Sequence, residues 1–189
     1  DLLFEPSTEE IYNKDEPVIK NNNYNNILCD KFRKGHFDGV ITVLNKFFTI
    51  IKSNKVYFGE KDFQQLKIIE KFIQEKYKSL DLVSVPTKRS EEGIAYSSRN
   101  EKLSKKQIQD FISFHQQTEN FLKSLKKTFD IETANQKAKD FIVKQEIEDL
   151  DYFEFRNNDD LSFNGTVSES RLFYAIYKGK VRLIDNLKV

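Results

Sequence analysis

Three short segments of this lysine-rich chain hold many of the residues that could do chemistry. They are Arg33–Gly39, Gly59–Gln65 and Pro86–Asn100, which make up 29 of the 189 residues. Together they contain three of the six arginines, four of the six glycines and one of the two histidines. A guanidinium can bind carboxylate or phosphate through two parallel hydrogen bonds, and glycine lets a ligand approach the backbone. The clustering therefore predicts a site for an anionic ligand.

Two of these segments carry groups that suit a phosphate-bearing nucleotide. Gly59 to Asp62 stand at the start of a predicted helix, where free backbone N–H groups and the helix dipole favour an anion. Ser97-Ser98-Arg99-Asn100 adds two hydroxyls and a guanidinium. Each group also has a structural interpretation: Lys61 and Asp62 could be a first-turn charge pair and cap, and Ser97-Ser98 could cap a helix.

Three other polar or reactive residues favour structural roles. His36 is a single histidine before an apolar helix, where a satisfied structural histidine is commoner than a ligand or base. His115 lies among glutamine and glutamate residues, which indicates a solvated helix face. Cys29 follows Ile27 and Leu28 and is predicted to be a small apolar residue.

The elements that must position the three segments follow from the apolar spacing. Phe37–Ile51 is apolar at too many positions for a surface stripe, so a largely buried helix is predicted. Val56–Phe58 and Leu82–Val85 are predicted strands, and Phe63–Ile73 between them has the spacing of a helix. Strand, helix and strand predict a βαβ unit with parallel strands. Ligands of such sheets lie at the carboxyl ends of the strands, where Gly59 and the segment after Pro86 stand.

The second half of the chain predicts a different architecture. Two helices are followed by three strands, which is typical of a separate α+β unit with an antiparallel sheet. The predicted helices are Ser104–Lys127 and Ile131–Gln145, and the predicted strands are Tyr152–Phe155, Arg171–Tyr177 and Lys180–Ile184, the last two joined by a tight turn at Lys178-Gly179. The expected boundary lies near residue 87, which gives domains 1–87 and 88–189.

Composition excludes several classes of function. With 31 basic and 30 acidic residues, no positive excess is available to neutralise a row of phosphates, which argues against duplex nucleic-acid binding. No segment approaches the ~20 apolar residues that span a bilayer, so no membrane contact is expected. A single cysteine allows no intramolecular disulfide or cysteine metal cluster, which fits the cytoplasm.

The beginning of the chain predicts short elements. Leu2–Phe4 is a predicted strand, Ser7 is a good cap for a helix over Thr8–Tyr12, and Pro17–Lys20 is a second predicted strand. The chain contains no methionine and begins inside a predicted strand. We therefore expect it to be a piece of a longer protein.

The three segments resemble the pantothenate synthetase (pantoate–β-alanine ligase) family of the nucleotidyltransferase superfamily. Arg33–Val40 resembles the family segment R-P-G-H-F-x-G-V, Tyr57–Gln65 resembles Y-F-G-E-K-D-Y-Q-Q, and Pro86–Asn100 resembles P-T-x-R-x-x-x-G-L-A-x-S-S-R-N. The opening Asp1–Ser7 and the closing Arg182–Asn186 agree as well. Five anchors in the same order make the resemblance specific. Lys34 in place of proline and Tyr96 in place of methionine are departures that remove no polar contact.

The resemblance implies a fold and a reaction. The fold is α/β: a partial Rossmann-like nucleotidyltransferase domain whose first strands are missing, then a smaller α+β carboxyl-terminal lid domain with a three-stranded antiparallel sheet. The reaction joins pantoate to β-alanine with ATP and Mg²⁺, through a pantoyl adenylate, and releases AMP and pyrophosphate in the coenzyme A pathway. A homodimer is implied as well.

The resemblance also implies roles for individual residues. Lys61, Ser97, Ser98 and Arg99 would hold the phosphates and act in catalysis. Asp62 and the backbone of Gly59 would hold the ribose, and Gln65 would hydrogen-bond pantoate. Arg33 and His36 would line the substrate side. No residue is assigned to a metal, and the Ser97–Arg99 segment is expected to move when ATP binds.

One family feature is absent from these residues, and two alternatives stay open. The family needs an H-x-G-H motif and a second pantoate-binding glutamine, and a chain with only His36 and His115 cannot hold the motif. The chain could therefore be an incomplete domain that binds nucleotide weakly and catalyses nothing. It could also be another nucleotidyltransferase such as a cytidylyltransferase, although Gln64-Gln65 and Arg33–Val40 argue against that.

Overall fold

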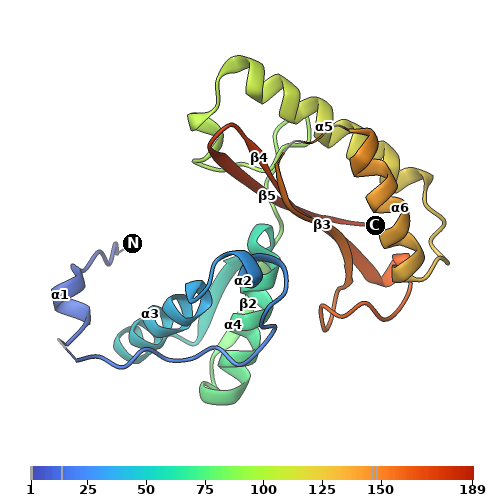
Figure 1. Ribbon diagram of the computed structural model, residues 1–189. Coiled ribbons are helices and arrows are strands. Elements are labelled where there is room, and N and C mark those ends of the chain that lie inside the picture. The colour runs from blue at the N-terminus through green and yellow to red at the C-terminus, as the bar shows by residue number, and fades with distance from the viewer. Residues whose placement is uncertain (1, 14, 146, 148) are drawn as a thin grey trace. The chain divides into compact units, whose positions relative to one another are not determined.

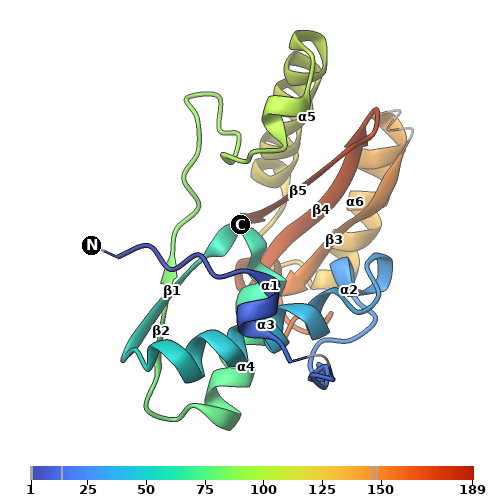
Figure 2. The ribbon, with the colours of Figure 1, turned by 90° about the vertical axis from the view of Figure 1, so that its left-hand side faces the viewer.

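The computed structural model describes residues 2–13, 15–145, 147 and 149–189 (Figures 1 and 2). The spacing of Cα atoms divides the chain into two compact units. The first unit comprises Asp1–Tyr57 and Lys67–Val83, and the second comprises Phe58–Leu66 and Ser84–Val189. The assignment of 1–87 and 88–189 as functional domains stays a prediction.

Helices account for about half of the first unit. Its elements, three of which continue into the second unit, are α1 (Thr8–Ile11), α2 (Leu28–Phe32), α3 (His36–Ile51), β1 (Lys55–Gly59), α4 (Phe63–Lys76) and β2 (Asp81–Val85). The helix predicted after Ser7 is confirmed as α1, because Ser7 and Glu10 form a capping box. β1 and β2 form a two-stranded parallel sheet with α4 between them in the chain, which confirms the βαβ unit.

Other expectations for the first unit are wrong or hold only in part. Leu2–Phe4 and Pro17–Lys20 form no strands, because no strand among the described residues pairs with them. The backbone N–H of Ile19 instead donates to Thr42 Oγ1 of α3, at 2.9 Å. The last residues of α3, Ile50 and Ile51, are about half exposed, so α3 buries one face and is less enclosed than predicted.

The second unit builds a three-stranded antiparallel sheet of order β3-β4-β5. Its elements are α5 (Lys105–Ser124), α6 (Ile131–Lys144), β3 (Leu150–Asn157), β4 (Ser170–Lys178) and β5 (Val181–Lys188), with 3₁₀ helices η1 (Glu60–Asp62), η2 (Asn100–Lys102) and η3 (Val167–Glu169). The sheet is confirmed, but Lys178 pairs with Val181, so Gly179 and Lys180 form the hairpin turn, one position later than predicted.

Figure 1 shows α5 and α6 on the same side of this sheet. Apolar side chains from both helices and all three strands form one core, which includes Phe111, Phe155 and Tyr174. Ser104 and Gln107 form a capping box that starts α5, and Asp130 caps α6 through the backbone N–H of Thr133. Within the described part of the chain, no helix combines the length and the apolarity needed to cross a membrane.

Candidate functional site

A small cavity in the second unit collects three of the predicted phosphate-binding residues. Lys61 comes from η1, and Ser97 and Arg99 come from the irregular segment between β2 and α5. The remaining lining residues come from the same segment, from α5 and from β5: Ala95, Asn100, Phe111, Leu183, Ile184 and Asp185. The cavity volume is about 10 Å³, which is about the least that admits one water molecule. Segments far apart in the sequence therefore meet here, in a closed arrangement.

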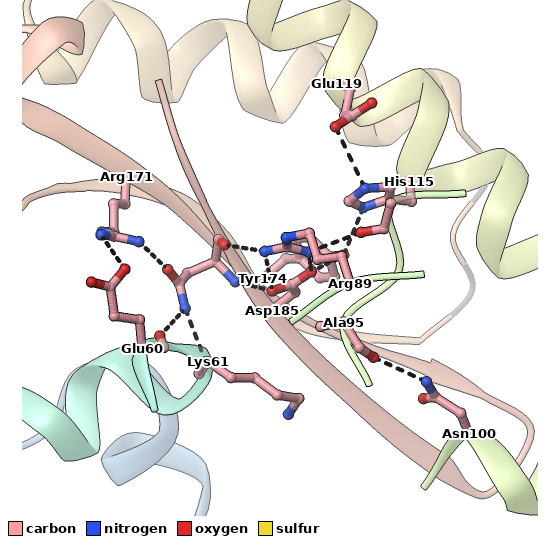
Figure 3. A network of polar contacts seen from close by, with 12 residues as sticks. Glu60, Lys61, Arg89, Ala95, Asn100, His115, Glu119, Arg171, Tyr174 and Asp185 are labelled. Carbon is pink, nitrogen blue, oxygen red and sulfur yellow. Dashed lines mark hydrogen bonds and ion pairs between the residues drawn. The ribbon is translucent and has the colours of Figure 1, made fainter. Parts of the chain in front are cut away.

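Lys61 is placed by hydrogen bonds from β5 to its own backbone. Asn186 Nδ2 donates to the carbonyl oxygen of Glu60 at 2.8 Å and to that of Lys61 at 3.0 Å. Asn186 is 2% exposed, so these bonds are shielded from water. The Lys61 side chain extends toward the side on which Ala95 and Asn100 lie (Figure 3), and it lines the cavity with them.

Arg171 of β4 reinforces the same contact. One guanidinium nitrogen, Nη1, donates to Asn186 Oδ1 at 2.7 Å, and the other, Nη2, pairs with Glu60 Oε2 at 3.0 Å (Figure 3). The guanidinium also lies 4.1 Å from the centroid of the Phe63 ring. β5 thus holds the backbone of Glu60 and Lys61, and β4 holds the side chains of Glu60 and Phe63.

The segment that carries Ser97 and Arg99 is held at its base by a buried ion pair. Arg89 Nη1 and Nη2 donate to the two carboxylate oxygens of Asp185 at 2.6 and 3.0 Å (Figure 3). The Asp185 side chain is 1% exposed and that of Arg89 is 26% exposed. Burial alone would lower the pKa of Arg89, but the hydrogen bond and charge of Asp185 outweigh it and the pKa is raised. Arg89 also donates to the carbonyl oxygens of Gly93 and Asn186.

Beyond this base the segment has fewer anchors. Arg89 and Ala95 form an isolated antiparallel bridge, and Asn100 Nδ2 donates to the Ala95 carbonyl at 3.0 Å. Among the described residues, the Arg99 guanidinium donates one hydrogen bond, which is long at 3.4 Å, to the carbonyl of Arg182. Ser97 Oγ accepts from the backbone N–H of Arg99 at 3.2 Å, and no serine side chain caps η2.

His115 is the clearest error of the sequence analysis. It is fully buried rather than solvated, because its face of α5 packs against β4: Tyr174 Oη lies 3.5 Å from His115 Nδ1 and also 3.5 Å from Asp185 Oδ2. Burial lowers the pKa of His115, Asp185 and Glu119 oppose that shift, and Arg89 adds to it. Burial and the charge of Asp185 raise the pKa of Tyr174.

Gly93 belongs to this buried contact and not to a ligand site. Its φ is +87°, and a Cβ atom there would lie 2.7 Å from His115 Nε2. Gly59 differs: its φ is −74°, and an added Cβ would meet nothing within 4 Å. The fold therefore requires glycine at residue 93, whereas the described residues place no such demand at residue 59.

The remaining predicted site residues lie outside the cavity lining. Asp62 and Ser98 are exposed and Gln65 is half-buried, all within the second unit. Arg33 and His36 lie in the first unit, where Arg33 Nη1 and His36 Nε2 are 2.9 Å apart. Gly35, with φ of +75°, separates α2 from α3 and lets these two side chains meet. Cys29 is buried in α2, as predicted.

Sequence reasoning missed the residues that hold the site together. In the sequence, Asp185 and Asn186 belong only to a closing segment with a family pattern, and Arg171 and Tyr174 only to a predicted strand. The available signal is an acid and an amide side by side directly after the predicted strand Lys180–Ile184, because polar groups that a strand carries into a core need partners.

A model of the family described as pantoate-beta-alanine ligase matches residues 1–188 of the chain. The chain belongs to this family. It is 35% identical over 193 residues to the pantothenate synthetase of Caldicellulosiruptor bescii and 36% identical over 195 residues to that of Aquifex aeolicus. Each alignment covers 100% of the chain and 68% of the relative, so the chain spans about two thirds of the length of these ligases.

Solved structures of pantoate–β-alanine ligases share the fold. A pantothenate synthetase from Thermus thermophilus has a TM-score of 0.86 at 28% identity, over 100% of this chain and 69% of that one. A ligase from Francisella tularensis, complexed with beta-gamma ATP and β-alanine, has a TM-score of 0.62 at 30% identity, over 99% of this chain and 59% of that one. The family is an enzyme family of pantothenate biosynthesis.

Proposed function

We propose that the chain supplies one side of the ATP site of a pantoate–β-alanine ligase that works through a pantoyl adenylate. First, a carboxylate oxygen of pantoate bonds to the α-phosphorus of ATP as the bond to pyrophosphate breaks. Then the amine of β-alanine bonds to the carboxyl carbon, the bond to AMP breaks and the amine loses a proton. The observation that carries the proposal is the convergence of Lys61, Ser97 and Arg99 on one cavity.

The site suits phosphate chemistry because its side chains supply charge and hydrogen bonds. A carboxylate is already ionised at neutral pH, so its attack on phosphorus needs positioning and charge stabilisation and not a strong base. Lys61 and Arg99 provide two positive charges, and Ser97 and Ser98 provide hydroxyl donors. We assign all four to the phosphate oxygens of ATP.

The assignments around the cavity rest on its immediate neighbours. Gly59 and Asp62 flank Lys61 in the chain and are assigned to the ribose. The absence of any packing demand at Gly59 supports this, because a ligand that approaches the backbone closely is a reason for glycine there. Gln65 is assigned to pantoate, and Arg33 and His36 to the substrate side.

The cavity must open before it can hold a nucleotide. Room for about one water molecule is far too small for ATP. The Ser97–Arg99 segment is the mobile wall in this proposal, since Ser98 is exposed and Arg99 makes one long hydrogen bond. Movement of such loops on substrate binding is common in enzymes that exclude water from the reaction.

We infer that Mg²⁺ arrives with ATP and not in a metal site built by the described residues. Among the described residues no group of three histidine, cysteine, aspartate or glutamate side chains could hold a metal ion. Asp185, which lines the cavity, and Glu60, which precedes Lys61, are paired with Arg89 and Arg171. Magnesium that accompanies ATP would bind phosphate oxygens, and no step above depends on it.

We also infer the wider setting of the site. Residues 1–87 would be the later part of a Rossmann-like nucleotide-binding domain and 88–189 a lid domain, in a longer cytoplasmic ligase that forms a homodimer. The greater length of the relatives supports the first point, and the lone buried Cys29 fits a reducing compartment. Light scattering of the longer protein tests the dimer, which a monomeric mass would contradict.

The deciding experiment is ATP–pyrophosphate exchange by the longer protein. We expect exchange that depends on pantoate, because pyrophosphate release requires the carboxylate as acceptor. Exchange without pantoate would overturn the proposal. Competition between ATP and CTP separates it from a cytidylyltransferase: CTP should not compete at equal concentration.

The isolated 189-residue chain is expected to bind nucleotide weakly and to make no pantothenate. The H-x-G-H motif that the family uses at the phosphates does not occur in these residues. Pantothenate formation by the isolated chain, measured by mass spectrometry with ATP, pantoate and β-alanine, would contradict this expectation.

A further inference from the structure

The lining of the cavity has two walls, which are Lys61 and the Ser97–Arg99 segment. Two neighbouring residues of β5 hold them in place. Asp185 binds Arg89, at the base of the segment that carries Ser97 and Arg99. Asn186 binds the backbone carbonyls of Glu60 and Lys61. Consecutive side chains of a strand point to opposite faces, so one dipeptide can reach two separate segments. The distance between the two walls is thereby tied to a single strand.

We propose that Asn186 is a positioning residue for Lys61 and that Asp185–Asn186 sets the spacing between Lys61 and the Ser97–Arg99 segment. The inference rests on the proposed function, since it takes Lys61 as a phosphate ligand. Asn186 acts through the backbone of Lys61 and does not line the cavity itself.

The contacts of Asn186 are specific to an amide. Its nitrogen donates twice and its oxygen accepts once from Arg171, so one planar group satisfies three partners. In Asn186→Asp the side chain keeps its shape and the oxygen that accepts from Arg171. A carboxylate oxygen replaces the donor nitrogen and faces the two backbone carbonyl oxygens. Arg171 in turn fixes the plane of the amide through its pair with Glu60 and its contact with the Phe63 ring.

The chain provides a matched control for the loss of these bonds. Asn135 of α6 also joins two elements through its amide: Nδ2 donates to the Phe155 carbonyl at 3.0 Å, and Oδ1 accepts from the Phe155 N–H at 2.7 Å. It contacts β3, outside the cavity lining. Asn135→Ala and Asn186→Ala therefore both remove hydrogen bonds to backbone, but only the second releases Lys61.

The test is a double-mutant cycle measured by pantoate-dependent ATP–pyrophosphate exchange in the longer protein. We expect Asn186→Ala and Asn186→Asp to lower kcat/KM for ATP about tenfold or more, and Asn135→Ala to lower it less than about twofold. In a Lys61→Ala background, Asn186→Ala should change the rate less than about twofold, because the group it positions is gone.

The outcomes separate this inference from the function on which it rests. An unchanged rate in Lys61→Ala would overturn the role of Lys61 and the positioning role with it. A slow Lys61→Ala enzyme with normal Asn186 variants, or an equal loss in both backgrounds, would overturn the positioning role alone.

If Asn186→Ala does not fold, Asn186→Asp completes the cycle. Amide hydrogen exchange then checks the geometry of the Asn186→Asp variant. Residues 62–66, which lie in the turn that Asn186 fixes through the Glu60 and Lys61 carbonyls, should exchange faster in that variant, and unchanged exchange with full activity would refute the inference.

Discussion

The two walls of the cavity differ in how they are held. Lys61 stands on a backbone fixed by Asn186, which is more than a hundred positions away, with Arg171 behind it. The opposite wall, Ser97 to Arg99, is fixed at its base by Arg89 and Asp185. Beyond that base, the described residues hold it through hydrogen bonds within its own segment and one 3.4 Å bond from Arg99 to the Arg182 carbonyl. One wall is bonded to the sheet through Asn186 and Arg171, and the other is attached to it through the ion pair of Arg89 and Asp185.

The difference indicates a division of labour within the site. A fixed cation gives a phosphate a defined place, and a loosely held segment can close over the nucleotide once it is bound. Long-range buried contacts resist local opening, whereas exposed segments with few bonds open easily. We therefore expect substitutions on the two sides to act differently.

The largest effect is expected where the buried anchor is removed. Asp185→Ala leaves the Arg89 guanidinium without its partner and should lower the free energy of unfolding by about 3–5 kcal/mol. Denaturant unfolding measures this change. Asp159→Ala, at an exposed position on the same unit, is the control and should leave stability unchanged. An Asp185→Ala protein as stable as the control would show that the Arg89–Asp185 pair does not stabilise the fold.

Loss of the fixed cation comes next. Lys61→Ala should reduce kcat/KM for the complete reaction by a factor that corresponds to about 2–4 kcal/mol, as when one oxyanion donor is removed. Lys123→Ala, at an exposed position of α5, should leave the rate unchanged. Steady-state assays of pantothenate formation compare the two, and equal rates would remove Lys61 from the mechanism.

A smaller effect is expected at Gly93, inside the anchor. Gly93→Ala forces a positive φ on alanine and drives its Cβ against His115, which should cost about 1–3 kcal/mol of stability. Gly39→Ala is the matched control: its Cβ would meet nothing, and alanine favours a helix more than glycine. Thermal unfolding should therefore shift in opposite directions for the two variants. Parallel shifts would contradict the packing at His115.

The smallest effect concerns pH. His115 has a lowered pKa in the folded protein, so its neutral form stabilises the fold fully above the unfolded value of about 6.5. This stability is lost as pH falls from there toward the lowered folded pKa. Unfolding free energies at pH 7 and pH 5 should differ less in His115→Gln than in the original chain. An equal difference in both proteins would assign the pH dependence to other groups.

The local parts of the structure could be predicted from the sequence. Apolar spacing gave α4, α5, α6 and the three strands, because a helix or half-buried strand leaves a regular mark on its own residues. Ser7 marks the start of α1, because a capping side chain bonds the first turn of its own helix. The strand predicted at Leu2–Phe4 was wrong, because a strand needs a second strand to pair with, and local composition does not show whether that second strand is present.

The sequence could predict the side chains proposed to bind the ligand, but not the residues that hold those side chains in place. Lys61, Ser97 and Arg99 stood out by type and by their place after strand ends. Asp185, Asn186 and Arg171 did not, because their partners in other elements lie from 11 to 126 positions away. His115 was misjudged for the same reason: its neighbours along α5 are polar, but the face it occupies meets Tyr174 of a distant strand. Only tertiary packing shows these contacts.

The contrast between the fixed and the movable wall is tested most directly by amide hydrogen exchange of the longer protein with and without saturating ATP. We expect nearly the same exchange at residues 62–66 in both states, because Asn186 holds the carbonyls of Glu60 and Lys61 and so fixes the turn in which these amides lie before ATP binds. We expect faster exchange at residues 96–99 without ATP, and slower exchange there when ATP is bound. A change at 62–66 as large as the change at 96–99, or no change at 96–99 on addition of ATP, would contradict the contrast between the two walls.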